Sequence, residues 1–396
     1  MKGRSKSSQA PDTRPSSKGE ERMGSDPVLV VGQSVRHIAC SAARAGLEVF
    51  AADCYRDLDL EESVSKSFLL ECDPSIPGDL TRSAEDLIRR VLDRESIDTL
   101  VLGPGVEEMR VEGVRVLNNP QEKISEVSDK LWLARWLERE GFNSVPTWPL
   151  GEGTDCTEFP LMVKPRKGAG GAENRLATCE EDLAGLKGDL IVQEMVEGTP
   201  ASVSVIADGK EAVAISSNEQ LIGTSWLGGS GFRYCGNISP LESPREGPMI
   251  SEMMEIAEEI GARLQLVGSN GIDFLLTEKG PVVLEVNPRF QGSLDSVELS
   301  TGINLFRAHQ LSFDGRLPRK PKPRGFGGRA IVFAKDDIKI GTDLRGATAW
   351  VADVPRPGSF AKRGEPIASI RSFGKERGDA LDLLRRRSSS IYGALR

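Results

Sequence analysis

The fold is decided by residues 271–289, which read GIDFLLTEKGPVVLEVNPR. Two runs rich in apolar residues flank a polar centre at Lys279, and this pattern predicts two antiparallel strands. Pairing centred on Lys279 would put Asp273 opposite Glu285. Two carboxylates would then face each other on one side of a sheet, where like charges destabilise the pairing and partial burial increases the cost.

A divalent cation would relieve this repulsion, because oxygen-only ligands suit Mg²⁺ or Mn²⁺. Asn287 lies two residues beyond Glu285, so its side chain points to the same face and would supply a carbonyl oxygen. The same register puts Leu275 opposite Val283 and gives the carboxylates apolar neighbours. We therefore expect a metal site at Asp273, Glu285 and Asn287, with a solvent-exposed acidic strand face as the alternative.

A hard cation held by few carboxylates commonly shares its ligands with substrate phosphates, so phosphate-binding parts should be present. Lys164 ends the predicted buried strand 161–165, where an unpaired ammonium group would be costly. Gly168, Gly170 and Gly171 follow directly and would offer backbone N–H groups to phosphate oxygens. Taken alone, this loop would be an ordinary hairpin, and the absence of a GxxxxGKS/T motif excludes a P-loop NTPase.

The N-terminal part of the chain alternates between predicted strands and predicted helices. The strands are at 28–32, 48–53 and 99–103, and the helices are at 34–45 and 81–95. This alternation predicts a doubly wound parallel α/β domain. Gly32 ends the first strand without a GxGxxG motif, which favours a tight turn over a dinucleotide site. Asp53, at the end of the second strand, would either meet a ribose or cap a neighbouring segment.

Several of these features follow one another in a characteristic order. They are Lys130 at the start of a predicted helix, Lys164 before the glycine-rich loop, the strand end at 192–198, Asp273, and the segment 285–289. This order resembles the ATP-grasp superfamily of carboxylate–amine ligases, over about residues 28–395. The resemblance implies an α/β chain with an ATP-grasp fold of two α+β lobes. A parallel α/β pre-ATP-grasp domain would precede this fold, and a small β-rich closing region would follow it.

The expected division of the chain follows from this resemblance and from composition. Residues 1–26 are rich in Ser, Lys, Arg, Pro and Gly, so we expect a disordered tail, with a transit peptide as the alternative. The expected domains are a pre-ATP-grasp domain at 27–119, an ATP-grasp domain at 120–325 with lobes at about 130–198 and 199–325, and a C-terminal β-rich region at 326–396.

The resemblance also implies a nucleotide-binding set. Two lysines would contact the ATP phosphates and a glycine loop would close over them, while four residues at the hinge between the lobes would hold adenine and ribose. This set consists of Lys130, Lys164, Gly168, Gly170, Gly171, Glu194, Met195, Val196 and Glu197.

For the chemistry itself, the resemblance implies that Asp273, Glu285 and Asn287 bind two Mg²⁺ and that Arg289 is catalytic. Arg289 would stabilise the charge that develops on the transferring phosphoryl group and on the acyl phosphate under attack. An ion pair with an acidic residue of the following helix, Asp295 or Glu298, is the alternative. The chain departs from many members at Ser202 and Ser204, where they carry an acidic residue on the strand after the hinge.

Four other segments carry further expectations. Residues 226–241 are glycine-rich and would form a flexible loop over a site or a plain surface loop. A single helix is predicted at about 294–309. The segment 364–370 is similar to the closing domain of the biotin carboxylase branch. Arg385 to Arg387 are interpreted as a solvated helix face rather than an anion site.

Composition excludes several classes of protein. The chain has 396 residues, with 51 basic and 59 acidic side chains and a net charge of −8, which argues against sequence-independent nucleic-acid binding. It contains no apolar run long enough to span a membrane. Six cysteines without a CxxC pair indicate reduced thiols of a cytoplasmic protein, and two histidines give little support to zinc sites.

We therefore expect an ATP-dependent ligase that activates a small-molecule carboxylate as an acyl phosphate and joins it to an amine, releasing ADP and phosphate. A homodimer would fit this architecture. One alternative is a biotin-carboxylase-like enzyme using bicarbonate, although the chain has no Met-Lys-Met segment to accept biotin. The other is a nucleotide-binding module without catalysis, which retention of the metal ligands and Arg289 disfavours.

Overall fold

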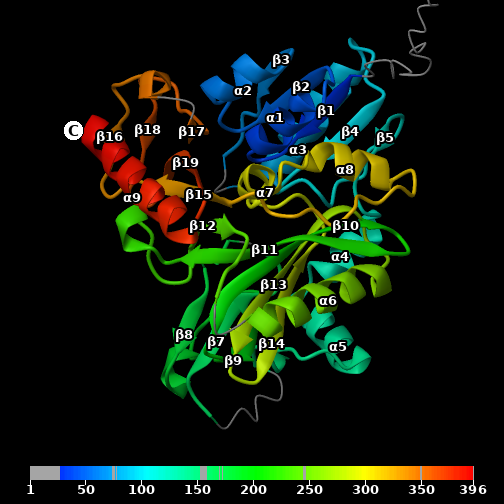
Figure 1. Cartoon of the computed structure of the whole chain (residues 1–396), viewed down its shortest axis with the longest axis vertical. Helices are drawn as coiled ribbons and strands as arrows, with labels where there is room; N and C mark the ends of the chain where they lie inside the picture. The colour runs from blue at the N-terminus through cyan, green and yellow to red at the C-terminus, as the bar shows by residue number, and fades with distance from the viewer. Residues whose placement is uncertain are drawn as a thin grey trace, which may run out of the picture.

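The computed structural model describes residues 27–73, 76, 78–151, 158–168, 170–171, 173–243, 247–347 and 350–395 (Figure 1). The expected tail at 1–26, together with Cys156 and Ala169, lies outside these residues.

The N-terminal domain is built on a parallel five-stranded sheet in the order β3-β2-β1-β4-β5, as predicted. Its strands are β1 (Val28–Val31), β2 (Val49–Asp53), β3 (Lys66–Leu69), β4 (Thr99–Leu102) and β5 (Arg115–Val116). Its helices are α1 (Arg36–Arg44), α2 (Leu58–Ser63) and α3 (Asp79–Leu92). Alternate residues of β1 pack against α1 on one face and α3 on the other, because successive side chains of a strand point to opposite faces.

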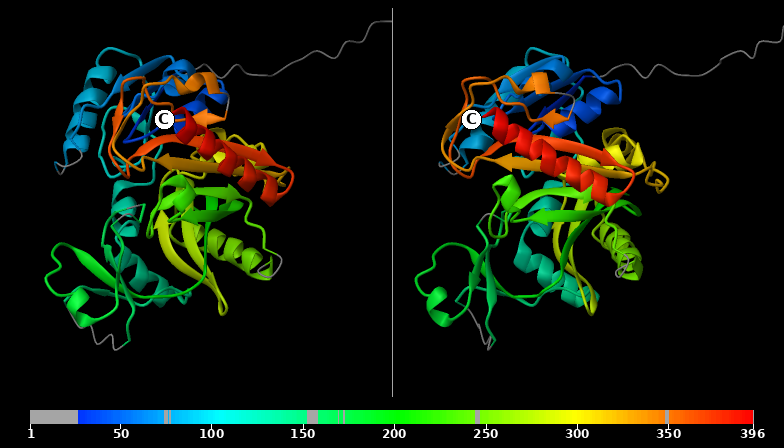
Figure 2. Two further views of the ribbon diagram at one scale, coloured as in Figure 1. Left: turned by 90° about the vertical axis from the view of Figure 1, so that its left-hand side faces the viewer. Right: turned by 60° about the vertical axis from the view of Figure 1, so that its left-hand side comes forward.

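The first lobe after this domain carries a four-stranded sheet in the order β6-β9-β7-β8 and projects away from the rest of the molecule (Figure 2). Its elements are β6 (Thr147–Pro149), β7 (Leu161–Pro165), β8 (Arg175–Ala177), the 3₁₀ helix η1 (Glu180–Asp182) and β9 (Leu190–Glu194). We call the part built on this sheet the small lobe. The helices α4 (Gln121–Val127) and α5 (Lys130–Glu140) precede it in the chain and pack against the core of the central sheet. The predicted helix start at Lys130 is confirmed, and the Asp129 carboxylate caps it by accepting from the backbone N–H of Leu131 and Trp132.

An eight-stranded sheet in the order β14-β13-β10-β11-β12-β15-β19-β17 forms the centre of the molecule. Its strands are β10 (Thr199–Asp208), β11 (Ala212–Ile222), β12 (Tyr234–Ser239), β13 (Val267–Thr277), β14 (Gly280–Asn287), β15 (Phe326–Phe333), β17 (Val351–Ala352) and β19 (Pro366–Gly374). The last three come from the predicted β-rich C-terminal region, so this sheet runs through the large lobe and the C-terminal region without a break. The remaining short elements are η2 (Ser225–Leu227), β16 (Ile338–Lys339), η3 (Leu344–Ala347) and β18 (Phe360–Ala361).

Four helices cover the large sheet: α6 (Gly247–Arg263), α7 (Leu294–Thr301), α8 (Leu305–Ser312) and α9 (Arg377–Ala394). Helix α6 packs Met253, Ala257 and Ile260 against β10 and β13, so its apolar face is part of the core. Helices α7 and α8 share one hydrophobic cluster with α1 and β1, which joins the large sheet to the N-terminal domain. Helix α9 lies along β15 and β19 (Figure 2).

Two predictions for this region are wrong. The helix expected at 294–309 is two helices, because Gly302 takes a left-handed φ of +80° and Asn304 then caps a new helix. The segment expected as a loop at 226–241 contains β12, a strand inside the large sheet. Gly236 misled the prediction: a Cβ there would lie 2.2 Å from the carbonyl oxygen of Arg329, so glycine permits close strand pairing rather than flexibility.

In the N-terminal domain, Gly32 and Asp53 have the structural roles considered above, a tight turn and a cap. A Cβ on Gly32 would lie 3.0 Å from the backbone of Gly103, which explains glycine at that tight approach. Asp53 is a capping residue, since its carboxylate accepts from the backbone N–H groups of Val35, Tyr55 and Arg56. The five described cysteines are free, as expected, although the Sγ atoms of two, at positions 54 and 72, are 3.2 Å apart.

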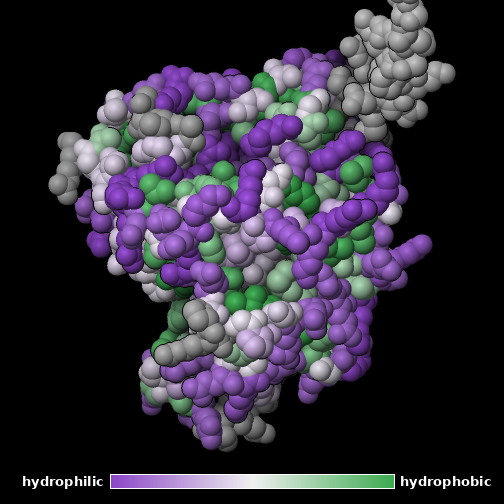
Figure 3. Space-filling model, viewed as in Figure 1, coloured by the Kyte–Doolittle hydropathy of each residue, from purple (hydrophilic) through white to green (hydrophobic). Residues whose placement is uncertain are grey.

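The surface is consistent with the charge composition. The face in Figure 3 is mainly hydrophilic, and hydrophobic residues form only small separate patches on it. Among the described residues, no helix combines the length and the apolar character needed to cross a bilayer.

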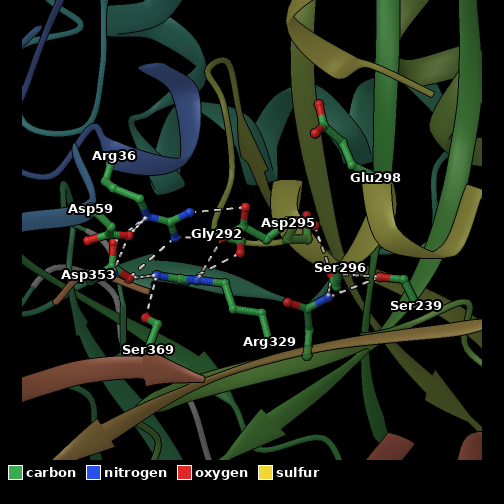
Figure 4. Close-up of polar contacts among 12 residues, drawn as sticks. Arg36, Asp59, Ser239, Gly292, Asp295, Ser296, Glu298, Arg329, Asp353 and Ser369 are labelled. Carbon is green, nitrogen blue, oxygen red and sulfur yellow. Dashed lines mark hydrogen bonds and ion pairs between the residues drawn. The ribbon is translucent and has the colours of Figure 1, made fainter. Parts of the chain in front are cut away.

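A buried group of charged side chains connects the N-terminal domain, the large lobe and the C-terminal region (Figure 4). This ion cluster consists of Arg36, Asp59, Asp295, Arg329 and Asp353. Nη2 of the first arginine lies 2.6 Å from Oδ2 of Asp295, and its Nε lies 2.8 Å from Oδ1 of Asp353. Burial opposes ionisation of both aspartates, but the adjacent guanidinium groups hold the pKa of each well below its usual range.

We expect Arg36→Met to lower the free energy of unfolding by about 3–5 kcal/mol, because it leaves buried carboxylates without their partner. Arg89→Met is the control, since Arg89 pairs with Asp86 on the surface, where such a pair contributes about 0–1 kcal/mol. Urea unfolding of both variants measures the difference. Equal losses in the two variants would contradict a structural role for the ion cluster.

Candidate functional site

A cavity of about 870 Å³ lies between the small lobe, the large sheet and the N-terminal domain. One part is lined by the small lobe and the hinge, including Met162, Lys164, Gly170, Gly171, Glu194, Met195, Val196 and Glu197. Another part is lined by the large sheet, including Gln220, Tyr234, Asp273, Glu285, Asn287, Arg289 and Arg329. A third part is lined by Gln33, Ser34, His37 and Pro104 of the N-terminal domain. All but two of the predicted site residues, Lys130 and Gly168, therefore line this cavity.

The predicted carboxylate pair is present. Asp273 on β13 lies opposite Glu285 on β14, as the sequence predicts. The predicted neighbour pair is wrong, because Leu275 lies opposite Val282. The hairpin turn pairs Thr277 with Gly280, which shifts the register by one residue, and a bulge beside Asp273 then restores the expected pairing.

The surroundings of Asp273 disfavour its ionised form, although two side-chain amides donate to it. Gln220 Nε2 donates to its Oδ1 at 3.0 Å, and Asn287 Nδ2 donates to its Oδ2 at 3.1 Å. Burial and the nearby charge of Glu285 nevertheless raise the pKa of Asp273 to about 7. A positive charge at this position would favour the ionised form.

The Asn287 amide points away from the orientation that a metal requires. Its nitrogen faces Asp273, and its Oδ1 accepts from Arg289 Nη2 at 3.2 Å. An amide that ligated a cation beside Asp273 would have to rotate so that the oxygen replaces the nitrogen. The two orientations fill the same space, so the change requires no movement of the strand.

The donor set fits a hard divalent cation. Within the described part of the chain, no group of three or more His, Cys, Asp and Glu side chains is arranged to hold a metal. Two opposed carboxylates and one amide leave most of an octahedral shell to waters and ligand phosphates, which is how Mg²⁺ is usually held beside a nucleotide.

The two lysines converge on the carboxylate pair. Lys130 is buried; its Nζ donates to the carbonyl oxygen of Gly168 at 2.7 Å and lies 3.6 Å from Glu285 Oε1. Burial lowers the pKa of Lys164, with Lys130 adding to the effect and Glu285 opposing it. Two ammonium groups beside two carboxylates form a site of mixed charge in which an anion and a cation can bind together.

The glycine-rich loop packs against residues 228–233, the part of the segment 226–241 that is neither helix nor strand. The backbone N–H of Tyr234 donates to the carbonyl oxygen of Gly170 at 3.2 Å. Gly171 has φ +67°, and a Cβ there would lie 2.3 Å from the carbonyl oxygen of Phe232. Glycine is therefore required at this contact.

Arg289 has a partner that the sequence did not predict. Its Nε lies 2.8 Å from Glu107 Oε1 of the N-terminal domain, and both side chains are less than one-fifth exposed. The two acidic residues considered as alternatives are elsewhere: Asp295 pairs with Arg36, and Glu298 with Arg44. That alternative is wrong.

Several cavity residues were missed by sequence reasoning. Gln220, His37 and Arg329 stand in no motif, and no local signal marks them, whereas Tyr234 belongs to the segment 226–241 that was expected over a site. Ser202 also lines the cavity and lies beside Ser204, where the resemblance expected an acid; Asn218 Nδ2 lies 3.2 and 3.1 Å from their hydroxyl oxygens. The predicted arginine triplet on α9 does not approach the cavity: Arg385 pairs with Asp382, and Arg387 lies over the Trp350 ring.

An α/β domain followed by two lobes that enclose opposed carboxylates and converging lysines is the arrangement of the ATP-grasp fold. Residues 127–293 match the family described as the ATP-grasp domain. Residues 127–293 therefore carry an ATP-grasp domain, and related chains with this domain use ATP to join a carboxylate to an amine.

Three known proteins show the extent of the similarity. An uncharacterized protein of Methanocaldococcus jannaschii, MJ0776, is 26% identical over 362 residues, covering 88% of each chain. The 3-methyl-D-ornithine–L-lysine ligase of Methanosarcina barkeri is 28% identical over 232 residues, or 55% of this chain and 59% of the ligase. The structure of biotin carboxylase from Campylobacter jejuni superposes with a TM-score of 0.72 at 17% identity, covering 90% of this chain and 89% of that one.

We expect Glu285→Gln to abolish ATP turnover while leaving the fold intact, because it removes a proposed cation ligand and relieves the repulsion with Asp273. Without Mg²⁺, the melting temperature of the variant should equal or exceed that of the parent chain. Turnover assays and thermal melts with and without Mg²⁺ measure both effects. Normal turnover at ordinary Mg²⁺ concentrations would remove the metal assignment.

Lys164→Met and Lys130→Met should raise the apparent KM for ATP or lower kcat, because each removes an ammonium group from the proposed phosphate site. Stability without nucleotide should change little at Lys164, because burial already disfavours the charge of its ammonium group. Kinetics and thermal melts on the same variant decide the point. Lower stability together with unchanged nucleotide dependence would show that the lysine is structural.

Proposed function

We propose that the chain is an ATP-dependent ligase that activates a small-molecule carboxylate as an acyl phosphate and joins it to an amine. The observation that carries this proposal is the cavity that contains the opposed carboxylates, Lys164 and Arg289 and extends to the N-terminal domain. It has room for a nucleotide at the hinge and for a second ligand beyond the carboxylates.

In the proposed reaction, a carboxylate oxygen attacks the γ-phosphorus of ATP and ADP leaves. The amine then attacks the acyl carbon, phosphate leaves, and the amine loses a proton. Bound Mg²⁺ or Mn²⁺ at Asp273, Glu285 and Asn287 would neutralise charge on the transferring phosphoryl group. Phosphoryl transfer depends chiefly on positioning and electrostatic stabilisation, so no nucleophilic side chain is needed.

The residues of the chain would have separate roles in this reaction, according to where they lie in the cavity. Lys130 and Lys164 would hold phosphates, with Gly168, Gly170 and Gly171 closing over them. The hinge residues Glu194, Met195, Val196 and Glu197 would hold adenine and ribose. Arg289 would donate to the transferring phosphoryl group, since its guanidinium is always charged and binds oxyanions in a bidentate manner.

The similarity to biotin carboxylase supports one second candidate, an ATP-dependent carboxylase that uses bicarbonate. ADP release measured across a panel of carboxylate and amine pairs, and with bicarbonate alone, separates the two. ADP release that requires both a carboxylate and an amine supports the ligase. Release that requires only bicarbonate would replace it with the carboxylase.

We further propose that the enzyme acts in the cytoplasm on small molecules and assembles as a homodimer. The similarity to the biotin carboxylase domain of Hydrogenobacter thermophilus 2-oxoglutarate carboxylase, which is a dimer, supports the proposed assembly.

Arg289→Ala should bind ATP with near-normal affinity while kcat falls by about 10²–10³, the scale for removing one transition-state donor. Glu107→Gln is the matched control, because it breaks the same ion pair and leaves the guanidinium in place. Calorimetric ATP affinity and kcat are measured on both. Equal kcat losses in the two variants would show that the ion pair, rather than the charge of Arg289, is what matters.

A further inference from the structure

The cavity ends at a part of the N-terminal domain suited to ligand binding. In its parallel sheet, β1 lies between β2 and β4, so the chain winds in opposite directions on the two sides of β1. Open parallel sheets bind ligands at this switch point, beyond the carboxyl ends of the strands. Gln33, Ser34 and His37 follow β1, Pro104 follows β4, and all four line the cavity.

Unpaired polar atoms gather at the same end. Among the described residues, four buried side-chain atoms have no hydrogen-bond partner: His37 Nδ1, His37 Nε2, Arg329 Nε and Ser372 Oγ. Three of the four therefore belong to two residues on the cavity wall. His37 is 5% exposed and Arg329 is 6% exposed, so bulk water does not compensate for the missing partners.

Some hydrogen-bond donors of the Arg329 guanidinium remain unused. Its Nη2 donates to Asp353 at 2.9 Å and to Ser369 at 2.9 Å, and its Nη1 donates to the carbonyl oxygen of Gly292 at 3.3 Å (Figure 4). Its Nε lies 3.7 Å from Asp295, beyond hydrogen-bond distance. Of the five N–H donors of this permanent cation, the Nε–H and one N–H of Nη1 are therefore left, and Nε has no hydrogen-bond partner at all.

His37 adds a second donor. Burial and the charges of Arg329 and Arg36 lower the pKa of His37 to about 3, so its imidazole is neutral at physiological pH. A neutral imidazole carries one N–H donor and one acceptor nitrogen. A buried polar group without a partner costs free energy, and a ligand that supplies the partner recovers it.

We propose that His37 and Arg329 bind an unreacted carboxylate of the amine substrate, which makes that substrate an amino acid. This inference rests on the proposed ligase function and names its acceptor class. Two N–H donors, one from a cation, match the two oxygens of a single carboxylate. A phosphate dianion would need more positive charge, because Asp353 already pairs with the same guanidinium. An ammonium group cannot accept from either donor.

The position of this subsite would let the amine of a bound amino acid reach the proposed reaction site. Asp273 and Arg289 line another part of the same cavity, so an amino acid held by its carboxylate at the N-terminal domain can direct an amine toward them. An amine without the carboxylate would lose the anchoring contact.

The test is binding of L- and D-amino acids, each compared with the amine that lacks its carboxylate, to the full chain saturated with MgADP. Calorimetry measures affinity, and ADP release in the presence of ATP measures turnover. We expect at least one amino acid to bind at least 10-fold more tightly than its matched amine, the scale of one or two hydrogen bonds to a charged group.

His37→Phe should weaken binding of that amino acid by about 10- to 100-fold and raise its KM, with the KM for ATP unchanged. His37→Gln keeps a donor and an acceptor and should restore most of the affinity. Ser372→Ala is the control, because it also removes an unpaired buried polar atom, at a residue that does not line the cavity. Melting temperatures without ligand should not fall in His37→Phe, since an unpaired polar group is replaced by an apolar one.

The outcomes separate the subsite from the ligase reaction. Failure of every amino acid to bind, or equal binding of an amino acid and its matched amine, would overturn the subsite. Turnover with amines that lack a carboxylate would keep the ligase and remove the subsite. Carboxylate-dependent binding without amine-dependent ADP release would keep the subsite and remove the proposed reaction. A His37→Phe variant that binds like the parent would overturn the assignment to this residue.

Discussion

The architecture depends on the buried pairing of Arg36 with Asp295 and Asp353. These three residues come from three separate parts of the chain, and each lies at the point where its part meets the other two. A buried ion pair is weakly stabilising when complete and strongly destabilising when one partner is removed. The pairing therefore selects one arrangement of the three parts more than it adds stability, because any other arrangement leaves a buried charge without its partner.

That arrangement also determines the cavity. Arg36 and His37 are neighbours at the start of α1, so the residue that locks the domains together places the imidazole on the cavity wall. Arg329 belongs to both the ion cluster and the cavity wall. Its Nη2 pairs with Asp353, while its Nε is left for a ligand. Glu107 connects the N-terminal domain to Arg289 in the same way. The proposed catalytic and substrate-binding residues are thus positioned by contacts between domains.

The difference between local and distant contacts explains what the sequence could predict. Asp273 and Glu285 are joined by a short hairpin, so strand alternation alone brings them together, and even an unforeseen bulge did not separate them. The parallel sheet and the start of α5 at Lys130 also follow from local patterns. The pair of Arg289 with Glu107 spans 182 residues and could not be predicted, because no periodicity connects its members. Gly236 shows the converse error, since glycine served strand packing where composition indicated a loop.

Two parts of the cavity have opposite electrostatic requirements. In the part lined by the large sheet, Asp273 has a pKa of about 7 because burial and Glu285 disfavour its charge, so a cation there would favour the ionised form. Near the N-terminal domain, the imidazole and the guanidinium Nε have donors without acceptors, so this part requires an anion or another acceptor. Neither part is satisfied by the chain alone. A protein selected only for stability would replace such groups with apolar ones, since unpaired buried polar atoms lower it. Their presence in both parts of one cavity is explained if two ligands of opposite electrostatic character, a metal nucleotide and a carboxylate-bearing substrate, bind there together.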